Sequence, residues 1–192
     1  MMNEFSNFRR VELLEGSILL QQGEYQKAKE SYENALNKDP YNLEALYGLG
    51  IICQYKQDFK HARELFERAL SVEEVSSQIL NSFGIVSAYL GDKESAINAF
   101  ERAVDIDPEF LDAQKNLADV YIEDGQYDRG IERYQSILRE HPDDVETLLT
   151  VAELYSESGD RKSTKFLFEK VIKIEPGNEI AKEGLEKLSD AS

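Results

Sequence analysis

The sequence is poor in the side chains that build disulfides and metal sites. It contains one cysteine, Cys53, two histidines and no tryptophan in 192 residues. A lone cysteine excludes an intramolecular disulfide, and its place in a helical segment indicates a small packed side chain rather than a reactive thiol. Three histidine and cysteine side chains in total do not supply a convincing ligand set for zinc. We therefore expect no disulfide, no metal and no cofactor.

Basic residues and long apolar runs are also scarce. There are 22 basic against 38 acidic side chains, a net charge of −16, which disfavours nucleic acid and anionic membrane surfaces as partners. No apolar run approaches the roughly 20 residues that span a bilayer. The first residues lack the basic start and apolar core of a signal peptide. The sequence thus predicts a soluble, cytoplasmic, acidic protein.

Signatures of catalysis are missing as well. His61 and His141 lie far apart in the sequence, at solvent-facing or turn positions, and no glycine-rich loop is suited to cradling a phosphate. Acidic pairs such as Asp143 and Asp144 fit a helix cap and a solvated turn better than a catalytic dyad. These features predict that the protein is not an enzyme.

What the sequence does contain is an internal repeat with a 34-residue period. The five blocks follow one another without insertion or deletion and cover residues 9–42, 43–76, 77–110, 111–144 and 145–178. Their eighth residues are all small: Gly16, Gly50, Gly84, Ala118 and Ala152. A second small column contains Ala28, Ala62, Ala96, Gly130 and Thr164. Four residues later each block has a ring: Tyr32, Phe66, Phe100, Tyr134 and Phe168. Small residues opposite rings indicate closely packed helix pairs.

Glycine and proline mark the ends of the predicted helices. Four blocks have glycine between the two helices, at Gly23, Gly91, Gly125 and Gly159, where a left-handed conformation ends a helix. Gln57 occupies this position in the second block. Four blocks close on Pro40, Pro108, Pro142 and Pro176. The residue two places on is Asn42, Asp144 or Asn178 in three of them, each able to cap the next helix.

Together these columns resemble the tetratricopeptide repeat (TPR) family over most of the chain. The resemblance implies an all-α fold in one domain, 1–192: a right-handed α-α superhelix, or solenoid, of five helix pairs plus a capping helix at 179–190. The first helix of each pair would line a concave surface. The pairs are expected at 9–22 and 25–38, 43–56 and 59–72, 77–90 and 93–106, 111–124 and 127–140, and 145–158 and 161–174. Glu12 and Glu15 replace a usual apolar pair, and Glu74 replaces the second closing proline.

The candidate binding residues are those on first helices that packing does not use. In the second and third blocks they are mainly aromatic, aliphatic and amide side chains: Tyr47, Ile51, Gln54, Tyr55, Asn81, Ser82, Ile85 and Tyr89. In the fourth and fifth blocks they become more acidic: Lys115, Asn116, Asp119, Glu123, Thr150 and Glu153. Rings can bury partner side chains, and Asn81 and Asn116 can bond a peptide backbone. The predicted partner is a peptide or protein that is apolar with a basic end.

Some family members grip the C-terminal carboxylate of heat-shock chaperones with Lys, Asn and Arg side chains. Lys115 matches the lysine, but Asp119 and Thr150 stand where asparagines are expected, so this specificity is disfavoured. Three functions remain open. The chain is a scaffold or adaptor that binds a partner in the groove, a self-assembling protein whose N-terminal segment (Phe5, Phe8, Val11 and Leu13) docks on a second copy, or a regulatory module of an enzyme or signalling pathway.

Overall fold

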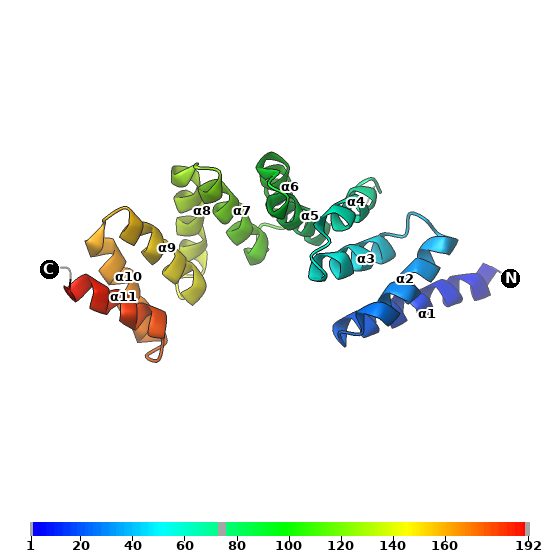
Figure 1. Ribbon diagram of the computed structural model, residues 1–192, viewed down its shortest axis with the longest axis horizontal. Helices are drawn as coiled ribbons and strands as arrows, with labels where there is room; N and C mark the ends of the chain where they lie inside the picture. The colour runs from blue at the N-terminus through cyan, green and yellow to red at the C-terminus, as the bar shows by residue number, and fades with distance from the viewer. Residues whose placement is uncertain (1, 73–75, 191–192) are drawn as a thin grey trace. The chain divides into compact units, whose positions relative to one another are not determined.

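The computed structural model describes residues 2–72 and 76–190, with side chains described for 11–72 and 76–189. Within these ranges the chain forms eleven helices and no strand (Figure 1). The helices are α1 (Met2–Gln21), α2 (Tyr25–Lys38), α3 (Leu43–Tyr55), α4 (Phe59–Leu70), α5 (Ser77–Tyr89), α6 (Lys93–Ile106), α7 (Leu111–Glu123), α8 (Tyr127–Glu140), α9 (Val145–Glu157), α10 (Arg161–Ile174) and α11 (Glu179–Asp190). Five helix pairs and a final helix are confirmed.

The first helix differs from its prediction. α1 begins at Met2, not at residue 9, because residues 2–8 contain neither proline nor glycine to stop a helix. Glu12 is accommodated by an ion pair, with 2.7 Å between its Oε1 and Lys38 Nζ on α2. Glu74 lies outside the described residues.

The chain divides into two compact units, Met1–Asn116 and Leu117–Ser192, which we call unit 1 and unit 2. The boundary falls inside α7. Unit 1 contains α1 to α6 and the first turns of α7, and unit 2 contains the rest of α7 and α8 to α11. The single domain 1–192 stays a prediction.

In unit 1 the predicted small and ring columns pack against each other. A Cβ added at Gly50 would lie 2.4 Å from the Phe66 ring, and one at Gly84 would lie 2.5 Å from Phe100. Both rings are buried. Tyr32 lies against two glycines, Gly16 and Gly48. Burial, with Glu44 nearby, raises the pKa of Tyr32 to about 12. Glycine is therefore needed wherever a ring crosses the facing helix at this distance.

Unit 2 uses the same packing with different residues. Tyr134 and Phe168 are buried, and Tyr134 donates a hydrogen bond to Asp119. Burial, together with this bond, raises the pKa of Tyr134 above its usual range. A Cβ at Gly184 of α11 would lie 2.3 Å from the Phe168 ring. The final helix thus covers the last ring of the repeat array, as a capping helix should.

The turns between paired helices have one backbone conformation. Gly23, Gly91, Gly125 and Gly159 have φ between 77° and 81°, and Gln57 has φ 59°. Gln57 therefore occupies a left-handed conformation that suits glycine better than any residue with a Cβ.

The predicted caps are also present. The side chains of Asn42, Asp144 and Asn178 accept bonds of 3.0, 2.9 and 3.0 Å from backbone N–H groups three residues on.

Candidate functional site

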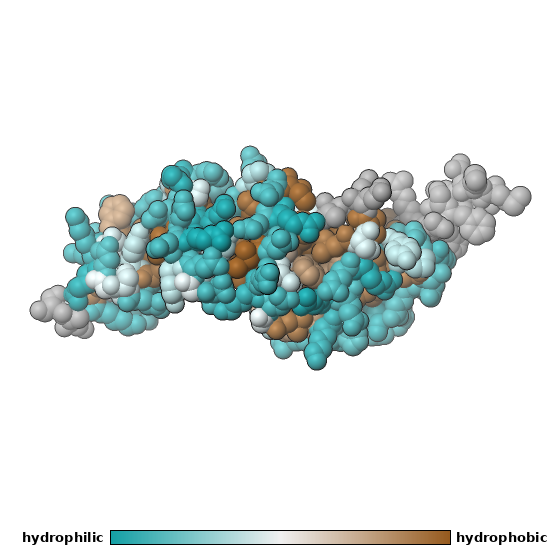
Figure 2. All heavy atoms as spheres, turned by 90° about the horizontal axis from the view of Figure 1, so that it is seen from above, coloured by the Kyte–Doolittle hydropathy of each residue, from teal (hydrophilic) through white to brown (hydrophobic). Residues whose placement is uncertain are grey.

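A pocket in unit 1 brings together four of the predicted binding residues. It has a volume of about 570 Å³ and is lined by Ile51, Gln54, Tyr55, Gln57, Phe59 and Tyr89. Ile51, Gln54 and Tyr55 come from the end of α3, Tyr89 from the end of α5, and Gln57 and Phe59 from the turn and start of α4. Exposed hydrophobic atoms are interspersed with hydrophilic ones over the α3 and α4 region of the space-filling view (Figure 2).

Aromatic pairs support the exposed rings of this pocket. Tyr55 and Tyr89 are 66% and 69% exposed, far more than a packed core ring. Phe59 stacks on Tyr89 with ring centroids 4.6 Å apart and 5° between the planes. Tyr25 lies 5.3 Å from Tyr55, centroid to centroid. Each exposed tyrosine is therefore held by a second ring, which lowers the conformational entropy that a partner must remove on binding.

The polar groups of the pocket are two glutamines. Gln54 Oε1 is buried, and no hydrogen-bond donor reaches it among the described residues. A buried acceptor without a donor is unfavourable by about 1–3 kcal/mol. Gln57 adds the left-handed backbone described above. The pocket thus combines exposed ring faces with a buried acceptor that becomes available to a ligand N–H only when the Gln54 side chain rotates.

The structure pairs the predicted asparagines with each other. Asn116 Nδ2 donates to Asn81 Oδ1 at 2.8 Å, and Asn81 is only 8% exposed. Ser82 is buried too, whereas Ile85, Lys115 and Asn116 are half-buried. Tyr47 packs 6.0 Å from the Phe66 ring and belongs to the edge of a core cluster. The lining of the pocket therefore includes none of these six predicted residues: Tyr47, Asn81, Ser82, Ile85, Lys115 and Asn116.

The predicted acidic residues lie on the first helices of unit 2. Asp119, Glu123 and Glu153 are exposed, and Asp119 is the acceptor for Tyr134. Thr150 is half-buried and donates to the carbonyl of Glu146 at 3.1 Å. The three carboxylates present negative charge to solvent, and Asp119 also supports the packing of the buried Tyr134 ring.

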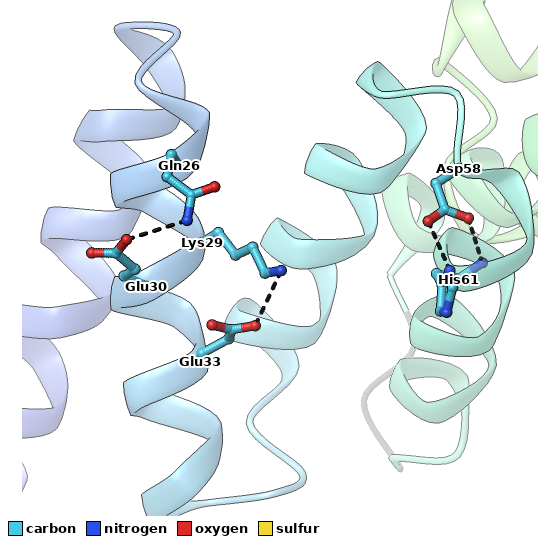
Figure 3. Close-up of polar contacts among 6 residues, drawn as sticks. All are labelled: Gln26, Lys29, Glu30, Glu33, Asp58 and His61. Atoms are coloured by element: carbon cyan, nitrogen blue, oxygen red, sulfur yellow. Dashed lines mark hydrogen bonds and ion pairs between the residues drawn. The ribbon is translucent and has the colours of Figure 1, made fainter.

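His61 has a partner that sequence analysis missed. Its Nδ1 lies 2.7 Å from Asp58 Oδ2, in the first turn of α4, and this contact raises the pKa of His61 and lowers the pKa of Asp58 (Figure 3). The neighbouring contacts on α2 join Gln26 to Glu30 and Lys29 to Glu33, one helical turn apart (Figure 3). These are surface contacts that stabilise helices. No group of three or more potential metal ligands occurs among the described residues.

Three residues that matter for the pocket were not predicted. Gln57 and Phe59 line it, and Tyr25 supports Tyr55. A signal was present in the sequence, because Tyr25 and Phe59 occupy the same repeat position, two residues after the left-handed turn residue. Their pairing with a ring of the next repeat depends on how the repeats stack.

Comparisons with protein-family models identify a single family, the tetratricopeptide repeat. Tetratricopeptide repeat models match residues 19–80, 89–150 and 122–188, and a second such model matches 54–109. The chain therefore belongs to the tetratricopeptide repeat family, whose members are generally non-catalytic scaffolds for protein interactions. No curated protein matches the chain significantly.

Solved structures agree on the fold. YrrB, described as a TPR protein with an unusual peptide-binding site, is 20% identical with a TM-score of 0.77, covering 91% of this chain and 90% of its own. A tetratricopeptide repeat protein from Parabacteroides merdae is 23% identical with a TM-score of 0.80, covering 94% and 72%. MamA from Desulfovibrio magneticus RS-1 is 20% identical with a TM-score of 0.80, covering 89% and 97%. Among the described helices, none is both long and apolar enough to cross a membrane.

Proposed function

We propose that the chain is a non-catalytic adaptor that binds a polypeptide segment in the pocket of unit 1. The observation that carries this proposal is the pocket itself: two tyrosines about two-thirds exposed, each supported by a second ring, beside a buried glutamine oxygen without a donor. Tyrosine is enriched among the residues that dominate protein interfaces. The family and the peptide-binding site named for YrrB support the same class of ligand.

The pocket favours a partner with an apolar side chain next to an N–H group. The apolar side chain would lie against Tyr55 and Tyr89. The N–H group would donate to Gln54 Oε1 after the Gln54 side chain rotates this buried oxygen into the pocket, and a purely apolar ligand would leave it unsatisfied. A partner's basic residues would be attracted by the exposed carboxylates of Asp119, Glu123 and Glu153 on unit 2. The cytoplasmic location and the regulatory alternative stay predictions.

Substitution of the two tyrosines tests the pocket against a matched control. Tyr41 is also 66% exposed in unit 1 but does not line the pocket. A partner captured from the native host would bind the Tyr55→Ala and Tyr89→Ala variants at least about tenfold more weakly, as expected for an interface hot spot. Tyr41→Ala would bind like the wild type. Equal affinity of all three variants, with unchanged circular dichroism, would show that the ligand binds elsewhere.

Self-assembly through the N-terminus is the second candidate, favoured by an exposed apolar stripe on α1. Val11, Leu14 and Ile18 are 59%, 60% and 45% exposed. The corresponding residues of α3 include Ala45 and Ile52, which are buried at the contact between successive repeats. Of the other residues predicted to dock, Leu13 is half-buried against the core cluster of α2 and α3, and the side chains of Phe5 and Phe8 lie outside the described residues. Light scattering tests this candidate: a Leu14→Lys, Ile18→Lys variant would lower the mass in solution if copies dock here, and a monomeric wild type would exclude it.

A further inference from the structure

Helix α10 has an exposed ring where the preceding repeats have polar side chains. Phe166 is 64% exposed. The corresponding residues of the four preceding second helices are all exposed and polar: Glu30, Glu64, Asn98 and Glu132. Packing within the repeat does not require an apolar residue at this position, because four repeats fold without one. Phe166 is thus a feature of the fifth repeat rather than of the fold.

Phe166 borders a groove in unit 2. The groove has a volume of about 420 Å³ and is lined by Gln135, Leu138, Val151, Tyr155, Lys162, Ser163, Phe166 and Leu167. Val151 and Leu167 are buried and Leu138 is half-buried, so an apolar base lies beside the exposed ring. Gln135 Nε2 donates to Tyr155 Oη at 3.1 Å, which links α8 to α9 at the rim. We call this the α8–α10 groove.

The charge of the α8–α10 groove is opposite to that of the chain. Lys162 is the one charged side chain in its lining. Helix α10 carries five basic side chains and one acidic side chain, Glu169, a formal charge of +4, and α8 carries three of each sign. Helix α9, which supplies Val151 and Tyr155, carries three acidic side chains and no basic one, so the three helices together have a formal charge of +1. The whole chain has a net charge of −16. Charges more than about 8–10 Å away are largely screened at physiological salt. A short ligand in the groove is therefore influenced mainly by the charge nearest to it, that of Lys162.

We propose that the α8–α10 groove is a second binding site, for an acidic polypeptide segment that inserts one apolar side chain beside Phe166. The apolar side chain would cover Phe166 and the base formed by Leu138, Val151 and Leu167. Acidic side chains flanking it would interact with Lys162, which is exposed, and with Lys165 beside the groove, whose Nζ also lies 3.8 Å from Glu169 Oε1. Extended polyanions fit less well, because a nucleic acid or an anionic membrane also meets the acidic remainder of the chain.

This site is separate from the pocket of the proposed function. It lies in unit 2, and six of its eight lining residues come from the second helices α8 and α10. The pocket in unit 1 is lined mainly by the first helices α3 and α5. The two ligands also differ in the charge they require. Each site can therefore be removed by substitution while the other is left intact.

Selection of short random peptides on the full-length chain tests the proposal. We expect enriched peptides with Asp or Glu on both sides of one Leu, Ile or Phe. Phe166→Glu installs the residue that three preceding repeats carry at this position, so the variant is expected to fold. It should weaken binding of the enriched peptides by at least about tenfold. Phe166→Leu should retain most of the affinity, and Lys162→Gln should weaken binding and its dependence on salt.

Two controls separate this site from its alternatives. The Tyr55→Ala variant should bind the acidic peptides like the wild type, and Phe166→Glu should leave binding in the unit 1 pocket unchanged. The proposal is overturned if no acidic and apolar peptides are enriched, or if those enriched bind Phe166→Glu equally well. It is also overturned if Phe166→Glu converts an oligomer to a monomer in sedimentation, which would make the occupant a second copy. Loss of binding to phosphatidylserine vesicles in this variant would instead identify a membrane site.

Discussion

The left-handed turn at Gln57 provides a sharp test of the backbone argument. A residue with a Cβ in this left-handed conformation destabilises the folded state by about 1–2 kcal/mol relative to glycine. Glycine in turn lowers the free energy of unfolding by about 0.4–1 kcal/mol, because it gives the unfolded chain more conformational freedom. The difference predicts that Gln57→Gly stabilises the protein by about 1 kcal/mol. The melting temperature would rise by about 2–4 °C for a chain of this size.

Gly91 allows the reverse experiment in the next repeat. The two turns have matching backbone hydrogen bonds, all 2.9 Å long. In the first turn, Gln57 N donates to Gln54 O and Asp58 N donates to Cys53 O. In the second, Gly91 N donates to Ala88 O and Asp92 N donates to Ser87 O. A Cβ at Gly91 would meet no atom within 4 Å. Gly91→Gln should therefore lower stability by about 1 kcal/mol through backbone conformation alone.

Thermal unfolding followed by circular dichroism, with urea unfolding as a second method, measures both changes. A Gln57→Gly variant that melts below the wild type would refute the reasoning, because side-chain contacts of Gln57 would then outweigh the strain. The same variant tests whether strain at the rim of the pocket serves binding. If partner affinity falls while stability rises, the glutamine is retained for its contact with the ligand.

Three further predictions follow from packing and charge. Phe66→Ala removes a fully buried ring and should destabilise the protein by about 3–5 kcal/mol in urea unfolding, whereas a loss below 1 kcal/mol would contradict the core assignment. Hydrogen bonds from Ser95, and the Arg63 guanidinium, lower the pKa of Asp92 in the folded protein. The ionised Asp92 therefore stabilises the fold above its unfolded pKa of about 4, and this stabilisation is lost as the pH falls through the folded pKa. Asp92→Asn should make stability fall less between pH 6 and pH 3, and an unchanged pH profile would count against this role. Burial raises the pKa of the Cys53 thiol, so alkylation near neutral pH should be slower in the folded than in the urea-unfolded protein.

The fold could be predicted because its determinants recur at fixed spacing. The eighth residue of each repeat and the ring sixteen residues later pack within one helix pair, so a column such as Gly50 and Phe66 carries its own structural meaning. Helix ends were predictable for the same reason, since Asn42 and Asp144 cap helices through local bonds. The start of α1 was not, because no residue before Arg9 marks an end.

The candidate site was only partly predictable, because exposure depends on the neighbouring repeat. Asn81 was expected to meet a ligand, yet it is covered and bonded to Asn116 of the next repeat. Tyr55 and Tyr89 remain exposed although Tyr25 and Phe59 of the preceding repeats contact one side of each ring. Phe166 was visible in the sequence as a break in a polar column, but only the groove beside it gives that break a meaning.

Photo-crosslinking in the native host tests the central claim, polypeptide binding in the unit 1 pocket, most directly. A photoreactive phenylalanine analogue would replace Tyr89, and in a control Asn98, an exposed residue on the second helix α6. We predict that residue 89 crosslinks to a defined polypeptide partner, that Tyr55→Ala in the same chain abolishes the adduct, and that residue 98 gives none. The same partner crosslinked from residue 98 but not from 89, or an adduct at 89 that persists with Tyr55→Ala, would contradict the account.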